Sequence, residues 1–327
     1  MKAIQIREFG EASVLQIAEV AEPRAGHGEV LVDVKAVGVN FADILMRRGG
    51  YSVRRQPPWI LGFEAAGVVV GTGAGVSEWK PGQRVMGTVL RETSGCYAER
   101  AVMPAWLLMP VPEALSFEEA AAFPEIFITA YLALHVFGRV ADGESVLIHA
   151  AGGGVGTAAV QLAHAMGARV FATAGSDEKL RKVKSLGADV LINYRSHDFP
   201  EELKKTTDGK GVDVILESVG GEVFEKSLQC LSPLGRLVVF GTSSSKASSV
   251  GARELMGGMI SVAGFSFGAL SVVRPGLIRE CMQAVMKFLA QEKIHPVVGH
   301  VFPLKEAAAA HELIANRANF GKVILVP

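Results

Sequence analysis

The chain has 327 residues, of which 49% are hydrophobic and 20% charged, so it can bury a sizeable core and form two domains or one large one. Lys and Arg together number 33, as do Asp and Glu, and the formal net charge at pH 7 is therefore zero. This balance argues against bulk nucleic-acid binding and against a polybasic membrane anchor, because both need clustered positive charge.

The cysteines and apolar runs favour a cytoplasmic protein. Cys96, Cys230 and Cys281 lie far apart, with no C-x-x-C and no Cys/His cluster, so neither a disulfide framework nor a zinc knuckle is predicted. A reducing compartment fits this usage best. Arg7 and Glu8 interrupt the first apolar run, and we expect no signal peptide. Other apolar stretches contain prolines and fall short of the roughly 20 residues that a membrane span needs.

The first third of the chain predicts short strands separated by turns. Strand patterns occur at Val30–Val39, Gly62–Gly71, Gly82–Thr88 and Tyr97–Val102, and one helix is expected over Phe41–Arg48. A β region this rich in glycine and valine favours barrel-like closure.

After Pro124, strand and helix patterns alternate. The expected strands are Ser145–Ala150, Arg169–Ala174, Val190–Asn193, Val212–Glu217, Arg236–Gly241 and Met259–Gly264. The expected helices are Val155–Met166, Asp177–Leu186, Pro200–Thr207 and Glu222–Leu231, and the tail adds helices near Leu277–Gln291 and Leu304–Asn316 and a strand at Lys322–Val326. Helices of this length between strands imply right-handed βαβ crossovers and a parallel sheet, so the fold class is α/β.

A glycine-rich turn stands between the first of these strands and its helix. Ala151-x-Gly153-x-x-Gly156 occupies the place of the G-x-G-x-x-G of dinucleotide-binding proteins. Small residues there permit a tight turn, close approach of the backbone to a pyrophosphate, and close packing of helix on strand. The helix N-terminus then presents N–H groups to the phosphates. Because strand, turn, helix and second strand follow in register, the pattern favours a dinucleotide site over a turn that merely packs a helix.

The residues after the second strand favour NADPH over NADH. An NAD site usually carries Asp or Glu about 20 residues after the glycines, to hold the ribose 2′-OH. Residues Thr173–Gly175 fill those positions, and Ser176 and Lys179 follow. A hydroxyl and a cation suit a 2′-phosphate, although Lys179 could also belong to the solvated face of its helix. Asp177 is interpreted as charge compensation in the first helical turn.

Longer stretches resemble a known family. They are HAAGGGVGTAAVQLA, GARVFATAGSDEKL, LGADVLINY, GKGVDVILESVGG, GEVLVDVKAVGVNFADILMRRGGY, LGFEAAGVV and NFGKVILVP. Together they resemble the quinone oxidoreductase (zeta-crystallin-like) branch of the zinc-free medium-chain dehydrogenase/reductase superfamily. The resemblance implies a GroES-like β-rich catalytic domain at 1–124, a Rossmann NADPH-binding domain with a doubly wound parallel sheet at 125–265, and a C-terminal segment at 266–327 that returns to the catalytic domain. It also implies a homodimer formed through the cofactor domains.

The zinc ligands of the metal-dependent relatives are not matched. Those relatives carry a Cys before the first-domain helix and a Gly-His-Glu further on. This chain has Asn40 and Asp43 near the first place and Gly62-Phe63-Glu64 at the second. A tetrahedral zinc site needs about three Cys, His or carboxylate ligands, and Phe63 cannot ligate. We therefore expect no metal, which argues against metal-assisted alcohol oxidation.

The resemblance also implies site residues. Asn40 and Tyr51 would line the pocket near the nicotinamide as candidate catalytic residues. The implied cofactor contacts are Thr129, Gly153, Gly154, Val155, Gly156, Ser176, Lys179, Tyr194, Phe240, Gly241, Ser243, Phe265, Phe267 and Lys322. Structural alternatives stay open: Asn40 as a helix cap, Tyr51 as a half-buried loop aromatic and Tyr194 as a strand-end aromatic. Glu64 and Asp43, the acids near the expected pocket, serve either as proton relays or as structural hydrogen-bond partners.

The functional hypothesis is hydride transfer from NADPH to an electron-poor acceptor, either a quinone or an α,β-unsaturated carbonyl. The cofactor carries the chemistry, and the protein supplies orientation and dryness. A quinone needs little proton help, whereas an enone needs an oxygen-side hydrogen-bond donor, for which Tyr51 or Asn40 is the candidate. Reduction of an enoyl thioester and non-catalytic NADPH binding for structural or RNA-binding work are the alternatives. Neither a nucleic-acid nor a membrane partner is expected.

Overall fold

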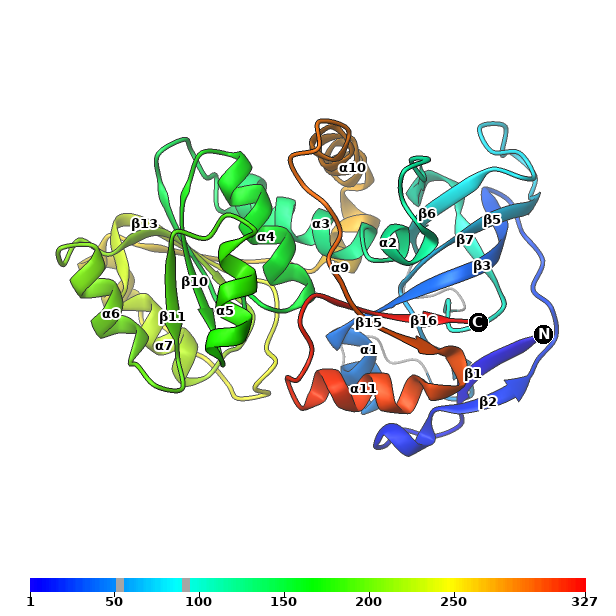
Figure 1. The fold of residues 1–327 in the computed structure, drawn as a ribbon, viewed down its shortest axis with the longest axis horizontal. Coiled ribbons are helices and arrows are strands. Elements are labelled where there is room, and N and C mark those ends of the chain that lie inside the picture. Colours follow the sequence, from blue (N-terminus) through cyan, green and yellow to red (C-terminus); the bar gives the residue numbers. More distant parts are fainter. Residues whose placement is uncertain (51–55, 90–94) are drawn as a thin grey trace. The chain divides into compact units, whose positions relative to one another are not determined.

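The chain folds into two compact units in a computed structural model that describes residues 1–50, 56–89 and 95–327. Unit 1 comprises Met1–Ile126 and Pro296–Pro327, and unit 2 comprises Phe127–His295. Figure 1 shows the strands and helices of both units, which we describe separately. Within the described residues, no helix is both long enough and apolar enough to cross a membrane.

Unit 1 is β-rich. Its larger sheet has the strand order β15-β16-β3-β5-β6-β8, with β7 also paired to β3, and a smaller sheet has the order β2-β1-β4. These strands are β1 (Lys2–Ile6), β2 (Gln16–Glu19), β3 (Glu29–Val39), β4 (Trp59–Ile60), β5 (Glu64–Thr72), β6 (Arg84–Thr88), β7 (Arg100–Pro104), β8 (Leu108–Pro110), β15 (Val298–Pro303) and β16 (Lys322–Val326). The tail strand β16 runs antiparallel to β3, with Val323 opposite Val39. This register brings the start of β16 beside the end of β3, where Asn40 follows.

Short helices close unit 1. They are α1 (Phe41–Arg47), α2 (Phe117–Ala121), α11 (Ala307–Ala315) and the 3-10 turns η1 (Ala12–Val14), η2 (Ala105–Leu107) and η4 (Leu304–Glu306). Helix α1 ends where Gly49 adopts a φ of 73°, a left-handed conformation that glycine tolerates at a helix end. The buried face of the sheet packs around Ile4, Val32 and Met103, and Leu304 and Ala307 of the tail join the same core.

Unit 2 contains a parallel six-stranded sheet in the order β11-β10-β9-β12-β13-β14. The strands are β9 (Ser145–Ile148), β10 (Arg169–Ala174), β11 (Val190–Asn193), β12 (Val212–Glu217), β13 (Leu231–Val239) and β14 (Ser261–Gly264). Numbered from β9, this order is 3-2-1-4-5-6, the order of the Rossmann fold, which confirms the predicted sheet. The chain reverses its direction of winding between β9 and β12, so ligands are expected at the carboxyl end of these strands.

Helices connect these strands and extend the unit. They are α3 (Pro124–Tyr131), which begins in unit 1 and enters unit 2 at Phe127, α4 (Gly154–Ala165), α5 (Asp177–Lys184), α6 (Phe199–Thr206), α7 (Glu222–Leu228), α8 (Ala252–Gly258), α9 (Phe267–Val273) and α10 (Pro275–Ala290), with the π-helix η3 (Leu132–Phe137) directly after α3. The resemblance predicts that the returning tail begins at residue 266, whereas residues 266–295 belong to unit 2. An aromatic contact joins this segment to α3, since Phe288 of α10 packs on Tyr131 with ring centroids 6.4 Å apart.

Some expected boundaries differ from the structure. Strand β13 begins at Leu231 rather than Arg236, because Leu231 pairs with Val212 before a register shift. Helix α7 accordingly ends at Leu228. The strand expected from Tyr97 begins at Arg100.

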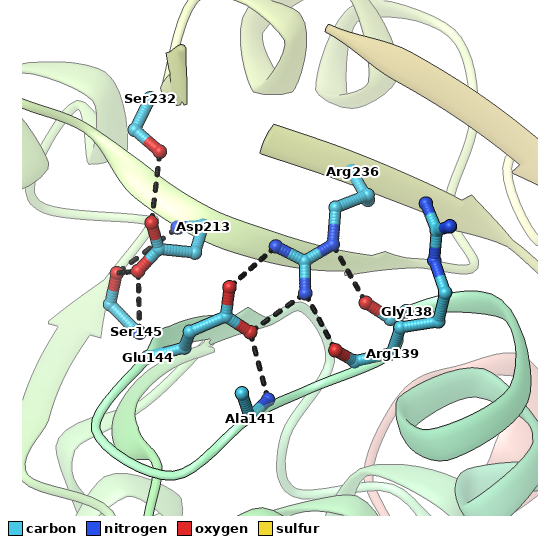
Figure 2. A network of polar contacts seen from close by, with 8 residues as sticks. All are labelled: Gly138, Arg139, Ala141, Glu144, Ser145, Asp213, Ser232 and Arg236. Carbon is cyan, nitrogen blue, oxygen red and sulfur yellow. Dashed lines mark hydrogen bonds and ion pairs between the residues drawn. The ribbon is translucent and has the colours of Figure 1, made fainter. Parts of the chain in front are cut away.

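A polar network secures the end of η3 and the amino ends of the strands (Figure 2). Arg236 of β13 donates from Nε to the carbonyl of Gly138 at 2.7 Å and from Nη2 to that of Arg139 at 2.9 Å. It also forms a two-pronged ion pair with Glu144, with both N···O distances 2.7 Å. These carbonyls lie where the π-helix ends, so the guanidinium satisfies groups that the helix leaves without partners. Asp213 of β12 accepts hydrogen bonds from Ser145 Oγ at 2.6 Å and from Ser232 Oγ at 3.1 Å.

Candidate cofactor and active site

The glycine turn lies between β9 and α4, as predicted. Gly153 precedes the helix, and its N–H donates to the carbonyl of Ala150 at 2.9 Å. A Cβ on Gly156 would lie 2.4 Å from the carbonyl oxygen of Ala150, so only glycine lets the helix approach the strand this closely. Gly154 and Val155 are partly exposed. The first-turn N–H groups of α4 have no partner within the helix, and they suit a pyrophosphate at this end.

A polar cluster forms where β10 and β11 end side by side, with Ala174 opposite Asn193. A Cβ on Gly175 would lie 2.7 Å from Tyr194 Oη and 3.2 Å from Arg195 Nε, so both side chains rest against this glycine. Ser176 caps α5 by accepting from the N–H of Lys179 at 3.3 Å. Burial and the nearby Arg195 guanidinium lower the pKa of Lys179. We call Ser176, Lys179, Tyr194 and Arg195 the anion cluster.

Arg195 of the anion cluster was missed by the sequence analysis. The signal was available, because Arg195 directly follows the predicted Tyr194 at the end of the neighbouring parallel strand. The carboxyl ends of adjacent parallel strands meet at one edge of the sheet. Two cations and two hydroxyl groups at such an edge would bind a phosphate.

Thr173 and Asp177 lie near the positions of an NAD-type acid, and both form hydrogen bonds within the fold. Thr173 is buried, and its hydroxyl lies 3.1 Å from His149 Nδ1. The other ring nitrogen of His149 lies 2.9 Å from Ser227 Oγ. Burial lowers the pKa of His149 to about 4, so this side chain is neutral at neutral pH and acts as a structural hydrogen-bond partner. Asp177 accepts from Asn193 Nδ2 at 2.8 Å in the first turn of α5.

Several residues predicted near the nicotinamide follow the carboxyl ends of β13 and β14. Phe240, Gly241 and Ser243 follow β13, and the N–H of Phe265 donates to the carbonyl of Val239 at 3.1 Å. Phe265 stacks on Phe240 at 6.2 Å and on Phe137 at 4.7 Å between centroids. Phe137 comes from η3, and the sequence analysis did not identify it. Phe267 begins α9, and Thr129 lies on α3 with 8% of its surface exposed.

A buried polar cluster in unit 1 contains Asn40, Glu64 and Lys322. Lys322 Nζ lies 2.6 Å from Glu64 Oε1 and 2.6 Å from Asn40 Oδ1. Asn40 Nδ2 donates to the same Glu64 oxygen at 2.9 Å. The second oxygen of Glu64 accepts from the backbone N–H of Glu125 at 2.8 Å. We call the three side chains the Asn40 cluster.

A second polar layer adjoins the Asn40 cluster. Asp43 accepts from the backbone N–H of Asn40 at 2.8 Å and from Tyr97 Oη at 3.2 Å, and Tyr97 Oη lies 3.0 Å from His311 Nε2. Burial raises the pKa of Asp43 to about 7 and lowers that of His311 to about 3. The Asp43 carboxyl group thus supports the start of α1, while the Asn40 side chain forms hydrogen bonds with Glu64 and Lys322.

Two sequence predictions bear on metal binding and catalysis. Phe63 is buried in the apolar core of unit 1 beside Glu64. Within the described ranges, no three His, Cys, Asp or Glu side chains gather as metal ligands would. Tyr51, the second candidate catalytic residue, lies outside the described residues.

Comparison with known proteins places this geometry in a family. Residues 26–113 match the alcohol dehydrogenase GroES-like domain, and residues 154–291 match the family described as zinc-binding dehydrogenase. The human synaptic vesicle membrane protein VAT-1 homolog is 36% identical over 96% of this chain and 82% of its own length. Rat quinone oxidoreductase is 35% identical over 100% and 98%, and 2-haloacrylate reductase of a Burkholderia species is 35% identical over 94% and 94%. The solved structure of Escherichia coli quinone oxidoreductase complexed with NADPH superposes with a TM-score of 0.93 at 34% identity, covering 100% of both chains.

The fold and these matches define a medium-chain dehydrogenase/reductase, an oxidoreductase class with a GroES-like domain and a Rossmann domain. Within that class, the chain belongs to the quinone oxidoreductase branch. The resemblance on which the sequence analysis relied is confirmed.

Proposed function

We propose that this protein is an NADPH-dependent reductase that transfers hydride to quinones or related electron-poor carbonyl acceptors without a metal. The observation that carries the proposal is the anion cluster, which lies at the β10–β11 edge where NAD-binding relatives would hold a ribose 2′-OH with a carboxylate. Two cations there suit the 2′-phosphate that distinguishes NADPH from NADH. The likeness to an Escherichia coli structure solved with NADPH supports the same assignment.

The residues of unit 2 have distinct tasks in this proposal. Gly153, Gly154, Val155 and Gly156 would bind the pyrophosphate through the α4 N-terminus. Thr129, Phe240, Gly241, Ser243, Phe265 and Phe267 would line the nicotinamide end. The bound cofactor would supply the hydride, and a two-electron reduction of a quinone also takes up one proton.

Unit 1 would supply the polar groups that meet the acceptor oxygen. The Asn40 amide has a second N–H, which is suited to donate to an oxygen that gains negative charge. Phe63 stands where metal-dependent relatives place a histidine ligand, which supports chemistry without zinc. Reduction of an enone or an enoyl thioester is the second candidate, and the likeness to a 2-haloacrylate reductase favours including it.

The assembly we propose is a homodimer through unit 2. Strand β14 is an edge strand, and exposed apolar side chains lie near it: Leu234 is 77% exposed, Met256 77% and Met259 57%. An open edge with neighbouring apolar residues favours pairing with a second copy. Light scattering after size exclusion measures this directly, and a monomer at micromolar concentration would contradict it.

The test of the proposed function is NADPH consumption with a panel of quinones and a panel of enones. Turnover with quinones is the expected result. Reaction with enones alone would overturn the quinone assignment. Tight NADPH binding without turnover of any acceptor would favour the non-catalytic alternative.

A further inference from the structure

We infer that Lys322 and Glu64 are positioning residues that lock the Asn40 carboxamide in one orientation, so that it presents an N–H to the acceptor oxygen. The inference rests on the proposed function and adds to it, because it assigns a task in the reaction to two buried charges. It also gives Lys322 a role other than the cofactor contact expected from the sequence.

The chemistry of the contacts fixes the amide orientation. An ammonium group only donates hydrogen bonds, and a carboxylate only accepts them. Asn40 Oδ1 faces Lys322 Nζ at 2.6 Å, and Asn40 Nδ2 faces Glu64 Oε1 at 2.9 Å. Turning the amide by 180° would set the NH₂ group against the ammonium and the oxygen against the carboxylate. Both new contacts would be repulsive, so the two charges select a single orientation.

The three side chains of the Asn40 cluster differ in exposure, which distinguishes their roles. Glu64 is 0% exposed and Lys322 is 2% exposed, whereas Asn40 is partly exposed. A ligand approaching from solvent would therefore meet the amide rather than the charges behind it. One amide N–H is donated to Glu64, and within the described part of the chain the second has no partner and could donate to that ligand. Of these three side chains, Asn40 is the catalytic residue in this scheme, because it is the one that would touch the substrate.

The frame around the Asn40 cluster keeps Glu64 in place. The second oxygen of Glu64 accepts a hydrogen bond from the backbone N–H of Glu125, which lies in the first turn of α3. A Cβ on Gly38 would lie 2.6 Å from Glu64 Oε1 and 2.7 Å from the carbonyl of Ala121, so glycine is required for the carboxylate to fit. Lys322 is fixed by the pairing of β16 with β3.

A stabilising role alone is a weak explanation for this ion pair. Burying two charges costs desolvation free energy that their attraction often only offsets, and apolar replacements of similar size are frequently as stable. Orientation of a polar group is a task that an apolar pair cannot perform. The buried pair therefore fits a positioning role better than a stabilising one.

The test compares the double variant Lys322→Met/Glu64→Gln with the wild type. The double variant removes both charges together and so avoids leaving one buried charge unpaired. Arg236→Met is the control, because it removes a partly buried cation from an ion pair with Glu144 in unit 2. Measurements are kcat and KM for a quinone and an enone, the Kd of NADPH, and the side-chain amide resonances of Asn40 in a ¹⁵N–¹H spectrum.

We expect kcat to fall about tenfold in the double variant, less than the roughly 100-fold or more that complete loss of an oxyanion donor costs, because the amide is still present. The fall should be larger for the enone than for the quinone, with the Kd of NADPH unchanged within about twofold. The control should keep kcat. Unchanged kcat in the double variant, or a loss that follows NADPH affinity, would overturn the inference.

The amide spectrum separates this inference from the proposed function. In the wild type, the Asn40 proton bonded to Glu64 should be shifted downfield, and the shift should disappear in the double variant. Identical Asn40 resonances in both proteins would overturn the positioning role whether or not any acceptor is reduced. If the wild type reduces no acceptor and the shift still disappears, the proposed function fails while the amide lock stands.

Discussion

Replacing Lys179 or Arg195 by alanine should weaken NADPH binding and leave NADH binding nearly unchanged. The two cations lie close enough for Arg195 to help lower the pKa of Lys179, and a 2′-phosphate between them would relieve this like-charge repulsion. Hydrogen bonds to charged groups contribute about 1.5–3 kcal/mol, and 1.4 kcal/mol is about tenfold in Kd.

The expected magnitudes follow from exposure. Lys179 is partly buried, and Lys179→Ala should raise the Kd of NADPH by about 30- to 100-fold. Arg195 is exposed and screened by solvent, so Arg195→Ala should raise it by about tenfold. NADH lacks the phosphate, and its Kd should change by less than about twofold or improve slightly, since one repulsive charge is gone.

Fluorescence titration of both cofactors at fixed ionic strength measures these constants. Lys182→Ala is the matched control, because Lys182 lies on the same helix and pairs with Glu178 at 2.8 Å. It should alter neither Kd. Equal losses of NADPH and NADH affinity in Lys179→Ala would refute the 2′-phosphate role, and an unchanged NADPH affinity in Arg195→Ala would remove Arg195 from the cluster.

Further predictions concern packing, acid stability and assembly. Gly156→Ala should weaken the binding of both NADPH and NADH and lower Tm, because the added Cβ would lie 2.4 Å from the Ala150 carbonyl oxygen. Calorimetry measures Tm, and fluorescence titration measures the two Kd values. The pKa of His149 is about 4 in the folded protein, against an ordinary value of 6.5. This difference contributes about 3 kcal/mol to the free energy of unfolding above pH 6.5, and the contribution is lost as the pH falls through 4. His149→Gln should therefore flatten the acid limb of urea stability curves, and an unchanged slope would contradict this. Asp43 has the opposite effect on the pH dependence of stability. Its pKa is raised to about 7, so its neutral form favours the fold, and the free energy of unfolding declines as pH rises from about 4 to 7. Asp43→Asn should remove that decline. Met256→Glu should favour the monomer in light scattering, and a dimer as stable as the wild type would exclude this edge.

Local features were predictable from the sequence. The strand, turn and helix around Gly153 and Gly156 are contiguous, so their pattern determines them without tertiary information. Ser176 and Lys179 are also local, since a helix cap and its third residue are set by neighbours in the chain. Tyr194 was accessible through the resemblance, and Arg195 was overlooked although it is the next residue.

Contacts between distant segments were not predictable. Asn40 and Lys322 are separated by 282 positions and Tyr97 and His311 by 214, and only the pairing of the tail with the first sheet brings them together. Phe137 was missed for a related reason: a π-helix departs from the 3.6-residue period, so helical periodicity does not show which way its ring points. The residue at which the tail joins unit 1, Pro296, is likewise determined by tertiary packing and not by a local pattern.

In the proposed function, the protein passes hydride from NADPH to a quinone without a metal. The most direct measurement is the rate of NADPH oxidation by protein dialysed against a strong chelator, with a quinone as acceptor and NADH as the comparison cofactor. The account predicts quinone-dependent oxidation that chelation leaves unchanged and that is faster with subsaturating NADPH than with NADH. Loss of this activity on chelation with recovery on adding zinc, or no quinone-dependent oxidation at all, would contradict it.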